Sequence, residues 1–348
     1  MGVTIYDIAS ASGVSIATVS RVFNGHTRVS CSARNQVMAA ADRLGYQPHV
    51  SARSLARKRA NVVSAVIPML TNLFFVEVLR GLQDRMAESE FDLLVFSART
   101  LDEVDVQLDR ALARGRSAGV LVFSSPMDDV RARRLTRSNQ PVVLVDSVHD
   151  AFDTVSTDNV EGGRLAAGHL VETGAERIAL VMAHPDSVPA ADRRRGFQEV
   201  LEAAGHAGLA SRTVHATDEL HHGYSEQAGF EAMRRLLDLG EVPDAVFATS
   251  DVQALGALEA LSMSGLRIPT DVRLMGFDDI MLSRHVGLTT VRQPMYELGR
   301  QAAERLVTRI DDPTREPVHT VLKPHLVVRG TTVESLMTHF PVMPEPVE

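Results

Sequence analysis

The chain of 348 residues has one cysteine, Cys31, and no tryptophan. A single cysteine excludes an intramolecular disulfide and fits a reducing compartment. Long hydrophobic runs are also missing, because no apolar stretch reaches the roughly 18–20 residues that a membrane helix needs. The first residues lack the basic start and apolar core of a secretory signal. We therefore expect a cytoplasmic protein with no membrane partner.

Motifs for cofactors, metals and catalysis are missing as well. The sequence contains no GxxxxGK[ST], HExxH or CxxC pattern. Its adjacent histidines, His221 and His222, have no cysteine or carboxylate at ligand spacing. We therefore predict no cofactor, no metal and no enzyme activity.

The composition is that of a globular protein with an uneven distribution of charge. Hydrophobic residues make up 45% and charged residues 23% of the chain, and the length predicts two or three domains. Residues 1–60 contain eight basic and two acidic residues, a net charge of +6, so the remainder carries −14. A basic head on an acidic body indicates that only the head contacts a polyanion.

Residues 4–45 are predicted to form three short helices. Ile5, Ile8 and Ala9 have the i, i+3, i+4 spacing of one inward helical face. Gly13 then provides a tight turn, and Ser15 is a suitable N-cap for the second helix. Two short helices joined by such a turn predict a helix-turn-helix, whose second helix enters the major groove of DNA.

The third predicted helix is followed by a basic segment. Ser30 can cap that helix, and Gly45 and Pro48 end it. Residues 52–59 then combine several basic side chains with one large apolar side chain, Leu55. The segment is too short for a stable isolated helix. It fits either a minor-groove wedge, with Leu55 between base steps, or a solvated linker.

Several short segments of the sequence resemble the lactose/galactose-repressor (LacI/GalR) family of bacterial transcription regulators. They are Val3-Thr4-Ile5-Tyr6-Asp7-Ile8-Ala9, Gly13-Val14-Ser15, Thr18-Val19-Ser20-Arg21-Val22 with Asn24, and Leu44-Gly45-Tyr46-Gln47-Pro48. The resemblance implies that Ile16, Ala17 and Arg21 read operator bases, that Leu55 is the lever of a hinge helix folding on the operator, and that other residues contact phosphates. The predicted DNA-contacting residues are Thr4, Ser15, Ile16, Ala17, Thr18, Ser20, Arg21, Asn24, Arg28, Ser30, Ala52, Arg53 and Leu55.

From residue 62 onward, apolar strands alternate with amphipathic helices in two successive runs. This alternation predicts doubly wound parallel sheets in two similar lobes. The fold class is then an all-α helix-turn-helix head with an α/β two-lobed body resembling periplasmic sugar-binding proteins. The expected divisions are 1–47 for the head, 48–60 for the hinge, 61–333 for the body and 334–348 for a proline-rich tail. By resemblance, the N-lobe takes 61–158 and about 289–318, and the C-lobe takes 159–288 and about 319–332.

Parallel sheets bind ligands at the carboxyl ends of their strands, so most candidate effector residues are those that follow or end predicted strands. Arg193 opens a predicted helix, and the resemblance selects it among three consecutive arginines, while Gln293 follows the second expected crossing between the lobes. Aromatic, carboxylate, amide and guanidinium groups among them suit a sugar or related metabolite, while a purine or another metabolite acting as corepressor stays the alternative. The set is Phe74, Phe75, Ser125, Asp146, Arg193, Ser250, Asp251, Asp278 and Gln293.

The tail and two positions depart from the family pattern. Three prolines and no leucine heptads follow residue 333, which predicts a homodimer rather than a coiled-coil tetramer. Leu73 stands where many relatives have proline, and Met295 where some have an aromatic lid. We expect the partners to be a double-stranded DNA operator, a small-molecule effector and a second copy of the chain. A transport binding protein is the rival, against which the basic head argues.

Overall fold

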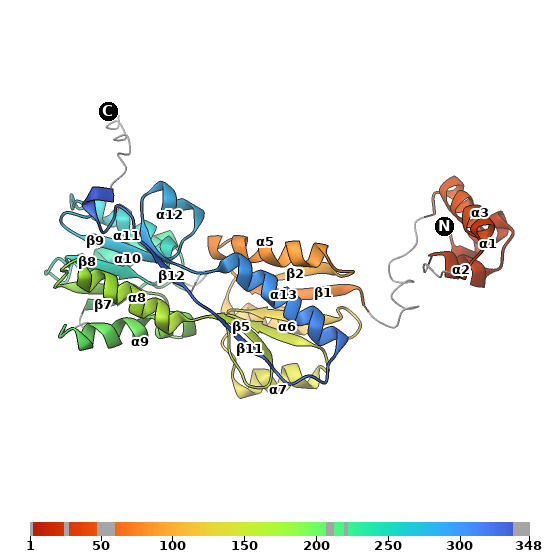
Figure 1. Ribbon diagram of the computed structural model, residues 1–348, viewed down its shortest axis with the longest axis horizontal. Helices are drawn as coiled ribbons and strands as arrows, with labels where there is room; N and C mark the ends of the chain where they lie inside the picture. Colours follow the sequence, from red (N-terminus) through yellow and green to blue (C-terminus); the bar gives the residue numbers. More distant parts are fainter. Residues whose placement is uncertain (1–2, 24–27, 47–59, 207–211, 219–221, 337–348) are drawn as a thin grey trace, which may run out of the picture. The chain divides into compact units, whose positions relative to one another are not determined.

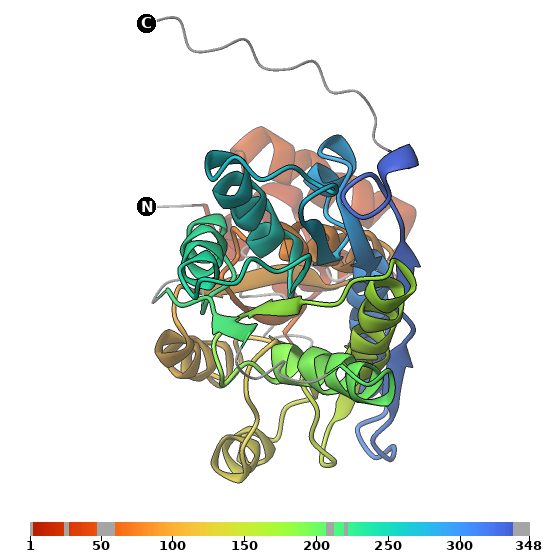
Figure 2. The same cartoon turned by 90° about the vertical axis from the view of Figure 1, so that its left-hand side faces the viewer.

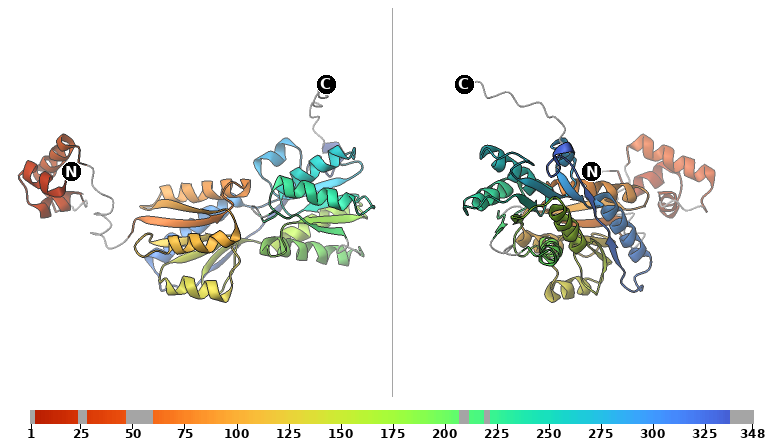
Figure 3. Two further views of the ribbon diagram at one scale, coloured as in Figure 1. Left: turned by 180° about the vertical axis from the view of Figure 1, so that it is seen from behind. Right: turned by 60° about the vertical axis from the view of Figure 1, so that its left-hand side comes forward.

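The computed structural model describes residues 3–23, 28–46, 60–206, 212–218 and 222–336 (Figures 1 and 3). The chain divides into two compact units, residues 1–61 and 62–348. The first unit is all-helical, and the second contains two six-stranded sheets. The predicted fold class is therefore confirmed.

Three helices lie in the described part of the first unit, and local sequence sets their ends. Their bounds are α1 Ile5–Ser12, α2 Ile16–Phe23 and α3 Cys31–Leu44. Thr4 and Asp7 form a capping box at the start of α1. The Ser30 hydroxyl accepts from the Ala33 amide at the start of α3. Gly13 and Gly45 end α1 and α3 with φ of 70° and 64°, a conformation that favours glycine.

The inward faces of these helices meet in one small core. Its buried members are Ile8, Ala9, Val19, Val22, Val37, Ala40 and Ala41. The same positions carry the helical spacing in the sequence, so hydrophobic periodicity accounts for the packing. The Arg43 guanidinium also donates to the Ala11 carbonyl, which joins α3 to the end of α1.

The first sheet of the second unit is wholly parallel. Its order is β11-β5-β4-β3-β1-β2. The bounds are β1 Val62–Pro68, β2 Asp92–Ala98, β3 Gly119–Phe123, β4 Val142–Val145, β5 Asp153–Thr157 and β11 His319–Leu322. The inner strands β1, β3 and β4 are buried along almost their whole length, as their continuous apolar runs predict.

Helices cover both faces of this sheet, and together they make the N-lobe. Helices α5 and α13 share one hydrophobic cluster, and α6 and α7 share the cluster on the other face. Their bounds are α5 Leu73–Ala87, α6 Leu101–Ala111, α7 Asp129–Arg137 and α13 Met295–Asp311.

The second sheet has the same plan and belongs to the C-lobe. Its order is β12-β10-β9-β8-β6-β7, and only β12 is antiparallel to its neighbour. The bounds are β6 Ile178–Met182, β7 Thr213–His215, β8 Ala245–Ala248, β9 Arg273–Asp278, β10 Thr289–Arg292 and β12 His325–Val327.

The C-lobe helices lie in pairs on opposite faces of that sheet, as Figure 2 shows in green and teal. One pair is α8 Asn159–Glu172 with α9 Val188–Ala203, and the other is α10 Glu226–Leu237 with α11 Asp251–Met263. A short helix, α12 Met281–His285, follows β9, and a 3-10 turn Glu334–Leu336 follows the last strand.

The chain crosses between the lobes three times, and two crossings differ from the expected positions. The first, at residue 158 between β5 and α8, agrees with the prediction. However, β10 pairs with β9 in the C-lobe, and β11 pairs with β5 in the N-lobe. The second and third crossings therefore fall near residues 293 and 323, rather than 288 and 319. Four-residue strands carry no sequence signal for the sheet they join, which is decided by pairing.

Within the described ranges, no helix is both long and apolar enough to span a membrane.

Candidate functional site

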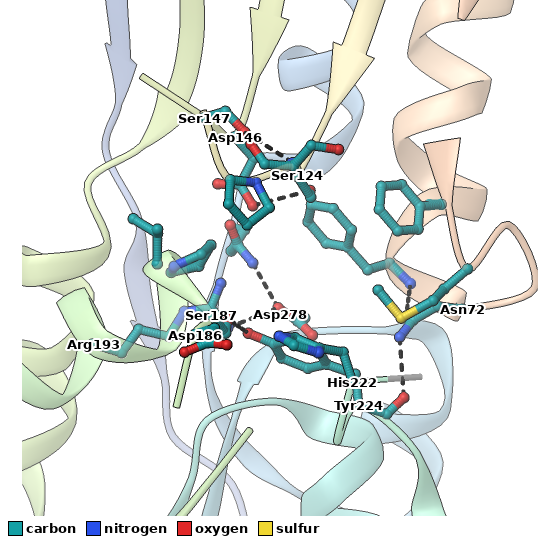
Figure 4. A pocket seen from close by; sticks show the side chains of 18 of the residues that line it. Asn72, Ser124, Asp146, Ser147, Asp186, Ser187, Arg193, His222, Tyr224 and Asp278 are labelled. Atoms are coloured by element: carbon teal, nitrogen blue, oxygen red, sulfur yellow. Dashed lines mark hydrogen bonds and ion pairs between the residues drawn. The ribbon is translucent and has the colours of Figure 1, made fainter. Parts of the chain in front are cut away.

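One pocket of the second unit lies at the carboxyl ends of strands from both lobes (Figure 4). It has a cavity volume of about 170 Å³. Both lobes and the second crossing contribute lining residues, as expected for ligand sites in doubly wound sheets. They are Met69, Asn72, Phe74, Phe75, Ser124, Ser125, Pro126, Met127, Asp146, Ser147, Val148, Asp186, Ser187, Val188, Pro189, Arg193, His222, Tyr224, Asp278 and Gln293.

Arg193 is the one arginine in this lining, and it is 3% exposed. Its Nε donates to Asn159 Oδ1 at 2.8 Å, and its Nη1 donates to the Thr249 carbonyl at 2.5 Å. The guanidinium carbon lies 3.8 Å from the Phe277 ring centroid, a cation–π contact. These partners come from three different elements, so the cation is fixed in place before any ligand arrives.

Glycine makes this position of Arg193 possible. A Cβ atom at Gly163 of α8 would lie 2.0 Å from the Arg193 carbonyl oxygen of α9. Only glycine therefore allows the two helices to approach so closely. The packing fixes the backbone from which the guanidinium extends.

Asp278 ends β9 and faces Arg193 across a short gap. The Asp278 Oδ1 to Arg193 Nη1 distance is 3.9 Å, and the Gln293 amide nitrogen donates to the same oxygen at 2.6 Å. Its φ of 124° turns the chain sharply as the strand ends. Burial raises the pKa of Asp278 to about 8, against the lowering effect of Arg193. Its carboxyl is thus a proton donor or an acceptor near neutral pH.

Asp146 supplies the corresponding carboxyl from the N-lobe. It follows β4 with φ of 54°. The Ser124 hydroxyl donates to Asp146 Oδ2 at 3.3 Å, whereas the buried Oδ1 has no hydrogen-bond partner among the described residues. Burial raises the pKa of this carboxyl, and the Arg193 charge and the side chains of Asn159 and Ser124 oppose the rise.

The aromatic wall of the pocket begins at the N-terminus of α5. Asn72 caps this helix by accepting from the Phe74 amide, and its Nδ2 donates to the Tyr224 carbonyl of the C-lobe at 3.3 Å. Phe74 and Phe75 meet edge-to-face with ring centroids 5.0 Å apart. Both rings belong to the N-lobe core and also line the pocket. Core filling and a place in the pocket wall are therefore compatible for both rings.

The C-lobe also lines the pocket with the polar side chains of Ser187, His222 and Tyr224. The Ser187 and Tyr224 hydroxyls lie 2.7 Å apart. The His222 and His184 rings stack with centroids 4.3 Å apart, and His222 Nε2 is buried with no hydrogen-bond partner among the described residues. Burial lowers the pKa of His222, and the neighbouring His184 lowers it further.

Ser250 and Asp251 were predicted as effector residues, but they do not line this pocket. Ser250 caps α11 by accepting from the Gln253 amide. Asp251 is fully buried and accepts from the Ile280 amide, the Ser283 hydroxyl and the Thr290 hydroxyl. Their polar groups hold the C-lobe together. Ser250 and Asp251 follow β8, as the sequence predicts, but their side chains form hydrogen bonds within the C-lobe and not at the pocket.

The other predicted effector residues do line the pocket, with one qualification at Ser125. They are Phe74, Phe75, Ser125, Asp146, Arg193, Asp278 and Gln293. The Ser125 hydroxyl donates to the Phe123 carbonyl, and its amide donates to the Ser147 hydroxyl. Ser125 thus contributes surface to the pocket while its polar groups already have partners. That any of these residues binds an effector stays a prediction.

Sequence reasoning missed the lining residues that follow β6 and β7. Asp186 and Ser187 come shortly after β6, and His222 and Tyr224 come after β7. The strand-end rule that found Asp146 and Asp278 would have found Asp186 and Ser187 as well. His222 and Tyr224 are harder to find, because they lie seven and nine positions beyond the end of β7.

In the first unit, α2 exposes the side chains that were predicted to read bases. Ile16, Ala17 and Arg21 are exposed, while Val19 and Val22 on the opposite face are buried. Ser15 accepts from the Thr18 amide at 3.2 Å, so both residues also serve the start of α2. Thr4 and Ser30 are caps, as described above. Asn24, Ala52, Arg53 and Leu55 lie outside the described residues.

Across the described segments, no group of three or more histidine, cysteine, aspartate and glutamate side chains could hold a metal ion.

Two sequence profiles match the two units. Residues 4–49 match "Bacterial regulatory proteins, lacI family", and residues 167–332 match "Periplasmic binding protein-like domain". The HTH-type transcriptional regulator CelR of Thermobifida fusca is 35% identical over 337 residues, which is 94% of this chain and 97% of the relative.

Solved structures agree with these matches. A transcriptional regulator CelR–cellobiose complex has a TM-score of 0.72 at 33% identity, covering 94% of this chain and 99% of the other. The lac repressor dimer bound to operator and the anti-inducer ONPF has a TM-score of 0.84 at 28% identity, covering 95% and 99%. The relatives are transcriptional regulators rather than enzymes. With a relative this similar over nearly its whole length, the chain belongs to the lacI family of bacterial regulatory proteins.

Proposed function

We propose that this regulator binds a near-palindromic DNA operator as a homodimer, and that a sugar in the pocket between the lobes controls its affinity. The observation that carries the proposal is α2, whose outward face bears Ile16, Ala17 and Arg21 on a fully packed helical frame. A helix that enters the major groove needs short side chains for close approach and an arginine that reaches guanine.

The sugar is favoured by the chemistry of the pocket. Sugar rings present hydroxyls at their edges and apolar CH groups on their faces. Asp146, Asp278 and Gln293 offer acceptors for hydroxyls, and Phe74 and Phe75 offer an aromatic surface. A CelR structure with cellobiose shows a sugar bound to a relative. A purine corepressor is the second candidate, because the same aromatic and carboxyl groups suit a base.

The proposed control acts through the two lobes. A ligand that contacts both Asp146 of the N-lobe and Arg193 of the C-lobe binds one arrangement of the lobes better than another, and it shifts the equilibrium by that difference in affinity. A coupling of about 1–3 kcal/mol changes operator affinity by about 5- to 150-fold. The direction, induction or corepression, follows from which arrangement binds the operator.

The test uses the full chain and DNA from upstream of its own gene. Fluorescence anisotropy is measured between about 50 and 200 mM salt, with a shuffled fragment as the control. We expect a preference for one fragment and a steep loss of affinity with salt, because phosphate contacts release counterions. Equal binding of native and shuffled fragments at every salt concentration would contradict the proposed function. A variant with Leu55→Gly then tests the hinge hypothesis, which rests on the sequence alone.

A further inference from the structure

The pocket collects polar atoms that have no partner. Six buried side-chain atoms in the described segments lack a hydrogen bond, and Asp146 Oδ1, His222 Nε2 and Gln293 Oε1 belong to residues that line this one pocket. A buried polar atom without a partner costs free energy, so such atoms require an explanation. Their convergence on one cavity, from both lobes and the second crossing, indicates that a ligand completes them.

The chemistry of these atoms specifies hydrogen-bond donors on the ligand. A carboxylate oxygen only accepts. The Gln293 amide nitrogen already donates to Asp278, so its carbonyl oxygen remains as an acceptor. The lowered pKa of His222 favours a neutral imidazole, which accepts or donates at Nε2. Hydroxyl groups satisfy all three atoms, since a hydroxyl can do both.

The charge of the lining disfavours an anion. Three carboxyl groups, on Asp146, Asp186 and Asp278, face the cavity with one guanidinium, Arg193. That guanidinium already donates to Asn159 and to the Thr249 carbonyl. Because burial raises the pKa of Asp146 and Asp278, an anion on the ligand would be buried beside carboxyls that already resist ionisation, and the guanidinium of the lining is already engaged; the desolvation of such an anion is costly.

His222 is held rigidly at the edge of the cavity. Its φ is 52°, and its carbonyl accepts from the His184 amide at 3.1 Å. The following Gly223 has φ of 84°, and a Cβ there would lie 2.2 Å from the Ala216 carbonyl oxygen. The Gln253 side chain donates to the Gly223 carbonyl at 2.8 Å. The turn is thus fixed on both sides, and the His184 ring stacks on the imidazole.

The size of the cavity limits the ligand. Its volume is about 170 Å³, and a cavity of about 150 Å³ is large enough to hold benzene. One six-membered ring therefore fits within the lobes as they stand. Figure 4 shows Asp146 and Ser124 on one side of this space, and His222, Tyr224 and Asp278 on the other.

We propose that His222 is a specificity-determining residue of this pocket, and that its Nε2 hydrogen-bonds one hydroxyl of an uncharged ligand ring. The ligand donates to Asp146 Oδ1 and Gln293 Oε1 and engages His222 Nε2. Phosphorylated and carboxylated forms of the same ring are rejected. The inference rests on the proposed role of the pocket as the effector site.

The first experiment compares matched ligands on the full chain. Isothermal titration is run with glucose, galactose, ribose and myo-inositol, and with glucose 6-phosphate, ribose 5-phosphate and glucuronate. We expect at least one uncharged compound to bind, with its charged counterpart at least about tenfold weaker. The sugars and myo-inositol all present hydroxyls on an uncharged ring, and their separate titrations show which of the two classes binds. Tighter binding of a charged counterpart, or binding of no uncharged ring, overturns the inference. In either case a preference for the operator in the ligand-free protein would leave the proposed DNA-binding function intact.

The second experiment tests His222 with the uncharged ligand that binds. His222→Phe keeps a flat ring and removes both nitrogens, and we expect it to weaken binding by about tenfold, the effect of one lost hydrogen bond. His222→Asn retains a polar group and tolerates the positive φ, and we expect it to lose less. Circular dichroism checks the folding of each variant, and His222→Ala replaces the phenylalanine variant if that one does not fold. Native affinity in the variant without ring nitrogens would show that His222 does not set specificity.

Discussion

The two units of this chain carry their functional side chains in opposite ways. In the first unit the predicted base-reading residues are exposed, with Ile16 40% exposed on α2. In the second unit Arg193 and Asp278 are 3% and 5% exposed. Exposed groups can change without disturbing the fold that presents them. A buried charge is part of the packing, so changing it alters stability and ligand binding together.

This difference follows from the size of the ligands. Double-stranded DNA approaches a surface, and its phosphates remain in contact with water and counterions. A small molecule is enclosed, and the removal of water strengthens each polar contact while making each unpaired group more costly. The following experiments test whether the two units separate in this way.

The largest effect is expected from Arg193→Met. The change removes the hydrogen bonds to Asn159 and the Thr249 carbonyl and leaves Asp278 without its cation. We expect a loss of about 3 kcal/mol in the free energy of unfolding, measured by urea denaturation, and no detectable effector binding. Arg195→Met is the matched control, because that side chain is 60% exposed and pairs only with Asp192 among the described contacts. Equal stability of the two variants would contradict a structural role for Arg193.

The next effect is expected in the first unit, from Arg21→Ala. We expect operator affinity to fall by about 1–3 kcal/mol, with the melting temperature unchanged, because the exposed side chain contributes to DNA contact and not to packing. Anisotropy and thermal unfolding measure the two quantities. Arg133→Ala makes the same charge change at an exposed site of the second unit. A similar loss of affinity in that control would mean that general charge, and not α2, determines binding.

Asp278→Asn tests the cost of burying a carboxyl. The folded-state pKa is raised from 3.8 to about 8. Between these values the unfolded chain releases the proton and the folded protein keeps it, so stability falls as pH rises. Asparagine does not titrate. From pH 4.5 to 8, we expect the stability of the variant to rise relative to that of the native protein by on the order of 1 kcal/mol. The melting temperatures of the two proteins, measured across this range, report the change.

An opposite slope comes from a surface carboxyl. Arg267 lowers the pKa of Asp271 to about 2, mainly through hydrogen bonds from its side chain and amide. The stability that this group contributes is present above the unfolded pKa and is lost as pH falls toward 2. Asp271→Asn should therefore remove a pH dependence of stability at acid pH and add no pH dependence between pH 5 and 8. For the buried carboxyl, a stability difference between Asp278→Asn and the native protein that stays constant from pH 4.5 to 8 would show that Asp278 is ionised in the folded state.

The smallest effect separates two roles of Ser30. Its hydroxyl caps α3 through the Ala33 amide, and the residue is also a predicted phosphate contact. Ser30→Ala should destabilise the first unit by about 1 kcal/mol and also weaken operator binding. Ser30→Asp restores the cap and places a negative charge beside phosphate. Recovery of stability without recovery of affinity would establish both roles, whereas recovery of both would exclude the phosphate contact.

Prediction from sequence succeeded where residues close together in the chain determine the local structure. The caps and turns at Ser30, Gly13 and Gly45 were read correctly because each depends on neighbours within one or two turns of chain. Asp146 and Asp278 were placed at the pocket because one follows an apolar strand and the other ends one. Ser250 and Asp251 satisfy the same rule, yet they cap α11 and bind three groups of the C-lobe. The rule gives the position of a residue and not the direction of its side chain.

The sequence by itself determined the helical head, the alternating strands and helices of the body, and the family. These depend on local periodicity, charge and order along the chain. Tertiary structure alone decided which sheet receives β10 and β11, where the chain crosses between lobes, and which polar atoms remain without partners in the pocket. The physical reason is that strand pairing and the satisfaction of buried hydrogen bonds join residues far apart in sequence, as Asp146 and His222 are joined around one cavity.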